Sequence, residues 1–210
     1  MKNTEWGAVA YLSHSIYGIN YEIRINNNAN FLTGYAATTE NGSSSTTDVA
    51  MWNTTTGYLA STTGNIMGIY DMSGGAYEYV MGVMKDANGN LMSGYNSTYN
   101  SGFNGTLFIG NAITNGINFL DDKYYDIYKF DDENINRARK ILGDATGELG
   151  SFKNYVSSWY NDTSYFVDTE RCWFGRGGIS NSSYSAGIFN VSNSGGSAYF
   201  SNSFRIALGL

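Results

Sequence analysis

The chain has 210 residues, of which 42% are hydrophobic and 16% aromatic, with 18 Tyr and no Pro. Disordered chains have few aromatic residues and a high net charge, so this composition excludes global disorder and predicts a folded core. The formal net charge is −6, and the sequence shows no stripe of basic residues. Because nucleic-acid binding depends on such a stripe, we expect no nucleic-acid partner.

The sequence contains a single Cys, Cys172, and a single His, His14. One Cys cannot form an intramolecular disulfide, and zinc sites usually take several His or Cys ligands, so we expect neither feature. We expect Cys172 to be a small buried residue and His14 an ordinary helix residue. No apolar run is long enough to cross a membrane, and none follows Met1 as in a signal peptide, so we expect no direct membrane insertion.

The first predicted elements are a helix and a strand. Residues 3–18 are typical of a helix, because Asn3 or Thr4 can cap its start and Gly18 can end it. In this helix Trp6 and Ala10 share one face with Val9. The alternation in residues 21–26 predicts a strand, and residues 38–48 have the composition of a loop.

The later elements follow similar signals. Residues 76–81 alternate like a strand, residues 86–118 predict long loops with short strands, and 131–143 predict a second helix that Gly143 ends. Residues 158–168 predict a turn leading into a short strand, and the last strands are expected at 171–178 and 203–208. We therefore expect one α+β domain over residues 1–210, with two helices, short antiparallel strands and long loops.

The stretch "GNIMGIYDMSGGAYEYVMG" at 64–82 carries a resemblance to a known family. It is similar to the pattern N-x-x-G-[IL]-[YF]-D-M-x-G-N-x-W-E-W of formylglycine-generating-enzyme-like (sulfatase-modifying factor) domains. The matching residues are Asn65, Gly68, Ile69, Tyr70, Asp71, Met72, Gly74 and Glu78; Tyr77 and Tyr79 replace the two Trp, and Gly75 replaces the Asn.

Two further matches follow at the family's spacing. They are Arg176-Gly177-Gly178, for its R-G-G, and Phe204-Arg205, for its final F-R, with Ser203 in place of the preceding Gly. The resemblance implies the C-type lectin fold of the formylglycine-generating-enzyme type. It covers roughly residues 3–210 and lacks the family's first strand.

The resemblance argues against catalysis. The oxidase members of the family share two copper-binding Cys shortly after R-G-G. This chain has Ser182 and Gly187 at those positions. Iron-dependent members need several His ligands. We therefore expect a protein that is not an enzyme. The alternatives are an oxidase-like enzyme of this family and an enzyme that uses the carboxylates of Asp71 and Glu78.

Another branch of the family fits the last part of the chain better. The variable proteins of diversity-generating retroelements carry their variable region between R-G-G and the final F-R. Residues 180–203 resemble such a region, with 185–189 as fixed scaffold. The implied ligand-binding residues are Asn181, Ser182, Tyr184, Asn190, Ser192, Asn193, Ser197, Tyr199 and Asn202.

The resemblance also implies a role and a location. The role would be receptor binding or adhesion, toward a protein or glycan on a host or neighbouring cell. Related domains occur in surface proteins of gut bacteria and in receptor-binding proteins of phages. We therefore expect an extracellular location, on a bacterial surface or a phage particle.

The composition of this segment points the same way. The run from Gly177 to Phe204 contains no Asp, Glu, Lys or Arg. Binding loops combine rigid Tyr, which supplies contact area, with Ser, Gly and Asn, which supply adaptable hydrogen bonds. The alternatives are a neutral structural loop, a flexible Ser/Gly/Asn linker, and a surface through which a structural subunit packs against its own copy.

One metal site is implied by the resemblance. In the family, the turn at this place provides backbone carbonyls and a Glu to calcium, and Gly74, Ala76 and Glu78 keep that spacing. Calcium accepts such oxygen ligands; the alternative is that Glu78 joins a hydrogen-bond network in the core. No other cofactor is expected. Asp71 is expected to bind backbone amides, and Arg205 to pair with a carboxylate or carbonyls in the core.

Overall fold

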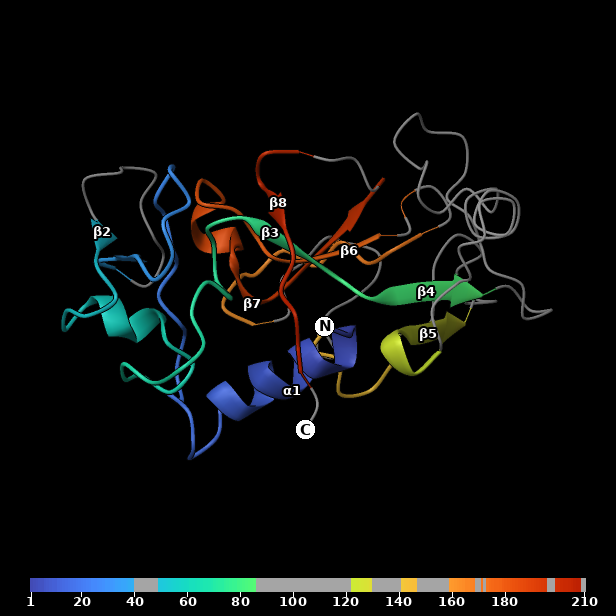
Figure 1. The fold of residues 1–210 in the computed structure, drawn as a ribbon, viewed down its shortest axis with the longest axis horizontal. Coiled ribbons are helices and arrows are strands. Elements are labelled where there is room, and N and C mark those ends of the chain that lie inside the picture. The colour runs from blue at the N-terminus through green and yellow to red at the C-terminus, as the bar shows by residue number, and fades with distance from the viewer. Residues whose placement is uncertain are drawn as a thin grey trace.

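The computed structural model describes residues 1–39, 49–85, 122–129, 141–146, 159–168, 171, 173–195 and 199–208. Within these ranges the chain is a mixed α+β fold (Figure 1). Its largest sheet has four strands in the order β7-β6-β3-β8, and two smaller sheets pair β1 with β2 and β4 with β5. Helix α1 runs below the large sheet in the view of Figure 1.

The strands are short. Their bounds are β1 Ala36–Ala37, β2 Val49–Ala50, β3 Tyr77–Val80, β4 Gly82–Lys85, β5 Asp126–Lys129, β6 Trp173–Gly177, β7 Gly187–Ser194 and β8 Asn202–Ser203. Short 3-10 helices lie at Gly57–Ala60 (η1), Asp122–Tyr124 (η3) and Ser183–Ser185 (η4). The predictions of strands at 76–81 and within 171–178 are confirmed by β3 and β6.

Helix α1 (Asn3–Ser13) begins where we expected a helix but ends earlier than Gly18. Lys2 is the N-cap residue, and its amide donates to the Glu5 carboxylate over 2.7 Å. The end at Ser13 has a local cause, because the Ser13 hydroxyl donates to the Ala10 carbonyl and so satisfies one of the last free acceptors. Trp6 and Ala10 are buried at the spacing of one helix face.

The core lies between α1 and the large sheet. Tyr128, Phe166 and Phe174 pack ring against ring with centroid distances of 4.6 to 5.7 Å. Trp6 is fully buried, and its indole N–H donates to the Ile188 carbonyl over 2.7 Å. This bond ties the helix to β7, the strand within the uncharged segment.

Some expectations about strands were wrong. Residues 21–26 form no strand, since their backbone contacts go to separate elements: Arg24 N donates to the Leu59 carbonyl of η1, the Ile25 carbonyl accepts from Ala37 N of β1, and Asn26 forms an isolated bridge to Gly74. The last strand covers Asn202–Ser203 and does not continue to 208. The expected antiparallel pairing holds for β1–β2, β3–β6 and β6–β7, whereas β3–β8 and β4–β5 are parallel.

Several predictions fall outside the described residues. Most of the expected second helix (131–140), all of the long loops at 86–118, residues 40–48 and Cys172 belong to this group. Of the turn and strand expected at 158–168, residues 159–168 are described, and they hold a turn followed by isolated bridge positions, among them Ser164, which pairs with Val191, in place of a strand. In the part of the chain that is described, no helix has the length and hydropathy to cross a membrane.

Candidate ligand-binding face of the central sheet

The strand register of the large sheet gathers a set of polar side chains on one face. In β3 the burial alternates, with Tyr77 and Tyr79 half-buried and Glu78 and Val80 buried. Tyr79 lies opposite Gly175 of β6, and Gly175 lies opposite Ser192 of β7. Because side chains alternate between the faces of a sheet, all of these residues point to the side away from the core.

This surface, which we call the tyrosine face, contains a pocket of about 230 Å³. We define the tyrosine face by seven residues that line this pocket: Tyr77, Tyr79, Gly175, Ser192, Ser194, Tyr199 and Asn202. None of the described residues that line the pocket carries a formal charge. The pocket therefore presents aromatic rings, hydroxyls and an amide, without an ion to desolvate.

Hydrogen bonds hold the polar groups of this face in place. The Tyr79 hydroxyl and Ser194 Oγ are 2.8 Å apart, and Asn202 Nδ2 donates to the Tyr79 hydroxyl over 3.0 Å. The Tyr79 ring also lies 5.8 Å from that of Trp173, centroid to centroid. Three strands thus fix one phenol, which preorganises the face for binding.

Tyr77 lies close to two serine side chains. Burial raises the pKa of the Tyr77 hydroxyl, and the neighbouring Ser192 and Ser182 side chains act in the opposite direction. Ser182 is fixed by its own loop, because its Oγ accepts from Ile179 N over 3.1 Å.

Gly175 forms the floor of the pocket. A Cβ added there would lie 3.4 Å from the Ser192 carbonyl oxygen and 3.5 Å from the Tyr77 ring, both ordinary van der Waals contacts. The backbone at Gly175 does not need the left-handed region that favours glycine, unlike Gly177 at φ +85° and Gly178 at φ +78°. The backbone therefore does not require glycine at this position, and a small side chain would fit in ordinary contact with its neighbours.

The ligand residues predicted from the sequence differ in where they lie relative to the tyrosine face. Ser192, Tyr199 and Asn202 lie on the tyrosine face. Asn181 and Tyr184 are exposed beside it, around η4, and Tyr184 is 58% exposed. These five residues, together with Ser182, remain candidates for ligand contact. Ser197 lies outside the described residues.

The amides of two predicted ligand residues are bound within the protein. Asn190 is 1% exposed, and its amide donates to the Ser185 carbonyl over 2.6 Å. Asn193 is among the residues that line the pocket, but its amide donates to Asp168 Oδ2 over 3.0 Å. Residues 187–191 of β7 are all buried, whereas 192–194 are half-buried, so the segment 180–203 is not a continuous display loop.

Four residues of the face were missed as ligand contacts: Tyr77, Tyr79, Gly175 and Ser194. Tyr77 and Tyr79 could have been found from the sequence, because they alternate with apolar or acidic residues in a strand that was predicted. Gly175 and Ser194 could not, because their place depends on the pairing of β6 with β3 and β7.

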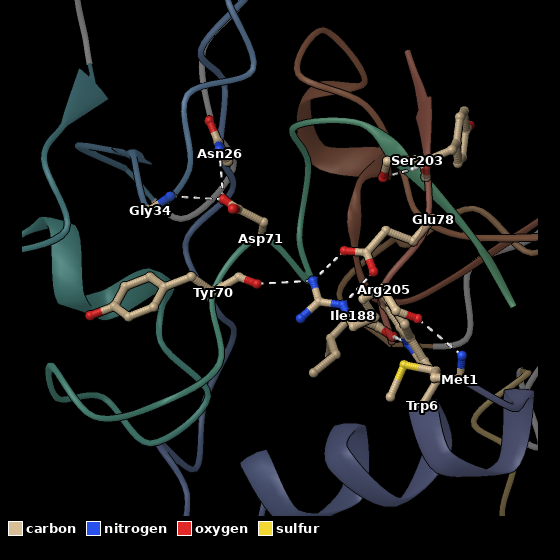
Figure 2. Close-up of polar contacts among 11 residues, drawn as sticks. Met1, Trp6, Asn26, Gly34, Tyr70, Asp71, Glu78, Ile188, Ser203 and Arg205 are labelled. Carbon is tan, nitrogen blue, oxygen red and sulfur yellow. Dashed lines mark hydrogen bonds and ion pairs between the residues drawn. The ribbon is translucent and has the colours of Figure 1, made fainter. Parts of the chain in front are cut away.

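The motif residues around Glu78 anchor the sheet (Figure 2). Both carboxylate oxygens of Glu78 accept hydrogen bonds from Arg205, and Arg205 also donates to the Tyr70 carbonyl over 3.0 Å. Glu78 is 4% exposed. Burial raises the pKa of Glu78, and the bonds and charge of Arg205 counteract that rise. The expectation that Arg205 pairs with a carboxylate and a carbonyl is confirmed.

This ion pair bears on the expected calcium site. Glu78 joins a core hydrogen-bond network, which is the alternative that the sequence left open, and Arg205 engages both of its oxygens. The described residues contain no group of three His, Cys, Asp or Glu that could hold a metal. Calcium at Gly74, Ala76 and Glu78 stays a prediction.

The two motif arginines meet at one aromatic ring. The guanidinium carbon of Arg176 lies 5.5 Å from the centroid of the Trp6 ring, and that of Arg205 lies 5.8 Å from it. Arg176 is fully buried and donates to the Ala145 carbonyl over 2.7 Å. The two ends of the uncharged segment are therefore attached to the same place in the core.

Asp71 is also a fixed part of this region. Its Oδ1 accepts from Gly34 N and from Asn26 Nδ2, each over 2.9 Å, as Figure 2 shows. The expectation that Asp71 binds backbone amides is confirmed for Gly34, which belongs to a distant loop. Asp71 thus joins two loops.

Comparisons with family models, with curated proteins and with solved structures give no match. The resemblance to formylglycine-generating-enzyme-like domains accordingly depends on the motif residues alone, and the geometry of the site carries the functional argument.

Proposed function

We propose that this chain is a non-enzymatic recognition domain that binds a neutral polar ligand on the tyrosine face. The observation that carries the proposal is the uncharged pocket whose Tyr and Asn side chains are held by hydrogen bonds from three strands. Rigid Tyr side chains lose little conformational entropy on binding, and hydroxyls and amides match the hydrogen-bonding groups of a glycan or an uncharged peptide segment.

The finer assignment belongs to the same proposal. We infer a C-type lectin fold of the formylglycine-generating-enzyme type, closest to the variable proteins of diversity-generating retroelements, with a role in receptor binding or adhesion outside the cell. The support is the anchoring of both motif arginines on Trp6 and the exposure of Asn181, Tyr184 and Tyr199. The partner would be a protein or glycan on a host or neighbouring cell.

The geometry disfavours the enzyme alternatives. A side chain at Gly187, one of the two positions of the family's copper cysteines, would collide with the Asp162 carboxylate. Glu78, as a catalytic carboxylate, would first have to leave Arg205. Both observations support a binding role over catalysis.

The test is a screen of glycan and protein arrays with the purified chain, followed by calorimetric titration of each hit. Tyr199→Ala and Gly175→Val should each weaken binding about tenfold or more, because the first removes a ring and the second fills the pocket floor. Thermal stability should stay within a few degrees of the parent. Tyr17→Ala is the matched control, since Tyr17 is exposed beyond the end of α1.

Two outcomes would contradict the proposal. If a saturable ligand binds with unchanged affinity to both face variants, the ligand site lies elsewhere on the chain. Turnover of a hit by the parent chain would remove the non-enzymatic part of the proposal.

A further inference from the structure

A second pocket lies next to the tyrosine face, on the other side of Asn202. Asn202 lines both pockets. The second pocket has a volume of about 330 Å³ and is bounded by the loop that carries Phe31, by the turn at Gly75 and Ala76, and by the segment from Phe200 to Arg205. Its chemistry differs from that of the tyrosine face, because it combines carboxylates with phenylalanine rings.

Three phenylalanine residues line the second pocket. Phe200 is 73% exposed and Phe204 is 74% exposed, so neither ring is used to build the core. Phe31 and Phe200 lie 6.0 Å apart, centroid to centroid. The face of an aromatic ring attracts a cation through the ring quadrupole. Rings that line a pocket and stay accessible to solvent are therefore available to a bound cation.

The backbone at this pocket is held in an uncommon conformation. Phe31 has φ +55° and Asp71 has φ +63°, in the left-handed region that non-glycine residues rarely adopt. For a bulky residue such as Phe31 this conformation is costly, and such strain concentrates at binding sites. The strained positions are those that bring the Phe31 ring and the Asp71 carboxylate to the pocket.

The charges in the second pocket leave one carboxylate oxygen open. Glu78 and Arg205 balance each other as an ion pair. Asp71 uses Oδ1 for Asn26 and Gly34, while its Oδ2 accepts no hydrogen bond from the residues that the structure describes. The charged side chains that line the pocket, Asp71, Glu78 and Arg205, therefore sum to one negative charge.

We propose that the second pocket binds an alkylammonium group, with the cation against the Asp71 carboxylate and its methylene or methyl groups against the rings of Phe31, Phe200 and Phe204. A neutral ligand would leave the open charge of Asp71 uncompensated, and an anion would be repelled by it. Such an alkylammonium group can come from the lysine side chain of a protein partner or from a free quaternary amine. The proposal does not depend on the tyrosine face.

The test is a titration of the full chain, followed by NMR chemical shifts, with matched small probes. Nα-acetyl-lysine methylamide and choline carry the cation, whereas Nα-acetyl-norleucine methylamide has a similar aliphatic side chain without the charge. Saturable binding of at least one cation, with no binding of the norleucine probe, is expected. Tighter binding of the lysine probe identifies a partner lysine as the source, and tighter binding of choline identifies a quaternary amine.

Three variants localise the binding. Asp71→Asn keeps an acceptor for Gly34 and suits the left-handed backbone, yet it removes the charge, so affinity for the cation should fall about tenfold or more. Phe200→Ala should weaken binding about threefold. Glu5→Gln is the control, because it removes one negative charge away from the pocket and keeps the cap of α1, so affinity should not change.

Four results would overturn the proposal: equal binding of the norleucine probe, no saturable binding of either cation, unchanged affinity in a folded Asp71→Asn variant, or saturable binding of a neutral saccharide at these residues. Gly175→Val separates the two proposals. It blocks the tyrosine face and should leave cation binding intact, so either site can fail without the other.

Discussion

The ion pair between Glu78 and Arg205 allows a quantitative test of the fold. Replacing Arg205 by Met keeps an unbranched side chain of similar length but removes the hydrogen bonds to Glu78 and to the Tyr70 carbonyl. Breaking a buried ion pair from one side costs about 3 to 5 kcal/mol, because the remaining charge is left without a partner. The Arg205 side chain is 23% exposed and that of Glu78 is 5% exposed, so we expect about 3 kcal/mol.

The loss should depend on pH. Burial already raises the pKa of Glu78, and Arg205 opposes that rise. Without Arg205 the pKa of Glu78 in the folded chain moves further above its value in the unfolded chain. Between these two pKa values the unfolded chain has already released the Glu78 proton, so the free energy of unfolding falls as pH rises. Arg205→Met should therefore lose more stability at pH 8 than at pH 5.

Urea unfolding followed by tryptophan fluorescence at both pH values provides the measurement. For a chain of this size a loss of 1 kcal/mol lowers the melting temperature by about 2 to 4 °C, so Arg205→Met should melt about 6 to 12 °C lower. In a double-mutant cycle, Glu78→Gln should recover part of the loss by removing the orphan charge. A loss below about 1 kcal/mol, or an equal loss at pH 5 and pH 8, would refute the reasoning.

Three further predictions concern other buried positions. Gly175→Ala should stabilise the chain by about 0.4 to 1 kcal/mol, because the added methyl group fits and restricts the unfolded chain. Burial raises the pKa of Asp162 well above its ordinary value, so Asp162→Asn should gain stability relative to the parent as pH rises from about 4. Burial lowers the pKa of His14, so the parent should lose stability as pH falls below about 6.5, and His14→Asn should reduce that loss.

Thermal melts across pH 4 to pH 8 check these predictions. A lower melting temperature for Gly175→Ala would show that the pocket floor has no room for a methyl group. For Asp162→Asn, a gap to the parent that stays constant with pH would contradict the expected burial of a protonated carboxyl group. For His14→Asn, an acid-induced loss as large as that of the parent would place the responsible group elsewhere.

The sequence predicted those elements that local signals determine. Strand β3 followed from the alternation around Glu78, and the start of α1 followed from its first turn. The extent of α1 was overestimated because the Ser13 hydroxyl competes for a helix carbonyl, an effect that periodicity does not show. Residues 21–26 alternate like a strand, yet their backbone contacts are divided between η1 and β1, which no local pattern reveals.

The sequence also predicted part of the candidate site, where composition alone was informative. Ser192, Tyr199 and Asn202 carried a compositional signal and lie on the tyrosine face. Asn190 belongs to the same polar composition but is buried, and its amide donates to the Ser185 carbonyl of η4, a contact that composition does not reveal. Gly175 reaches the site only through long-range pairing, which the sequence alone does not give.

The attachment of Arg176 and Arg205 to the single ring of Trp6 has a consequence for evolution. The guanidinium groups of Arg176 and Arg205 both lie against Trp6, so the two ends of the segment between them are fixed together in the core. Changes at its exposed positions, such as Tyr184, do not move these fixed ends. We therefore expect the exposed positions of this segment to tolerate substitution, while the buried residues of β7, among them Ile188, keep its place in the core unchanged.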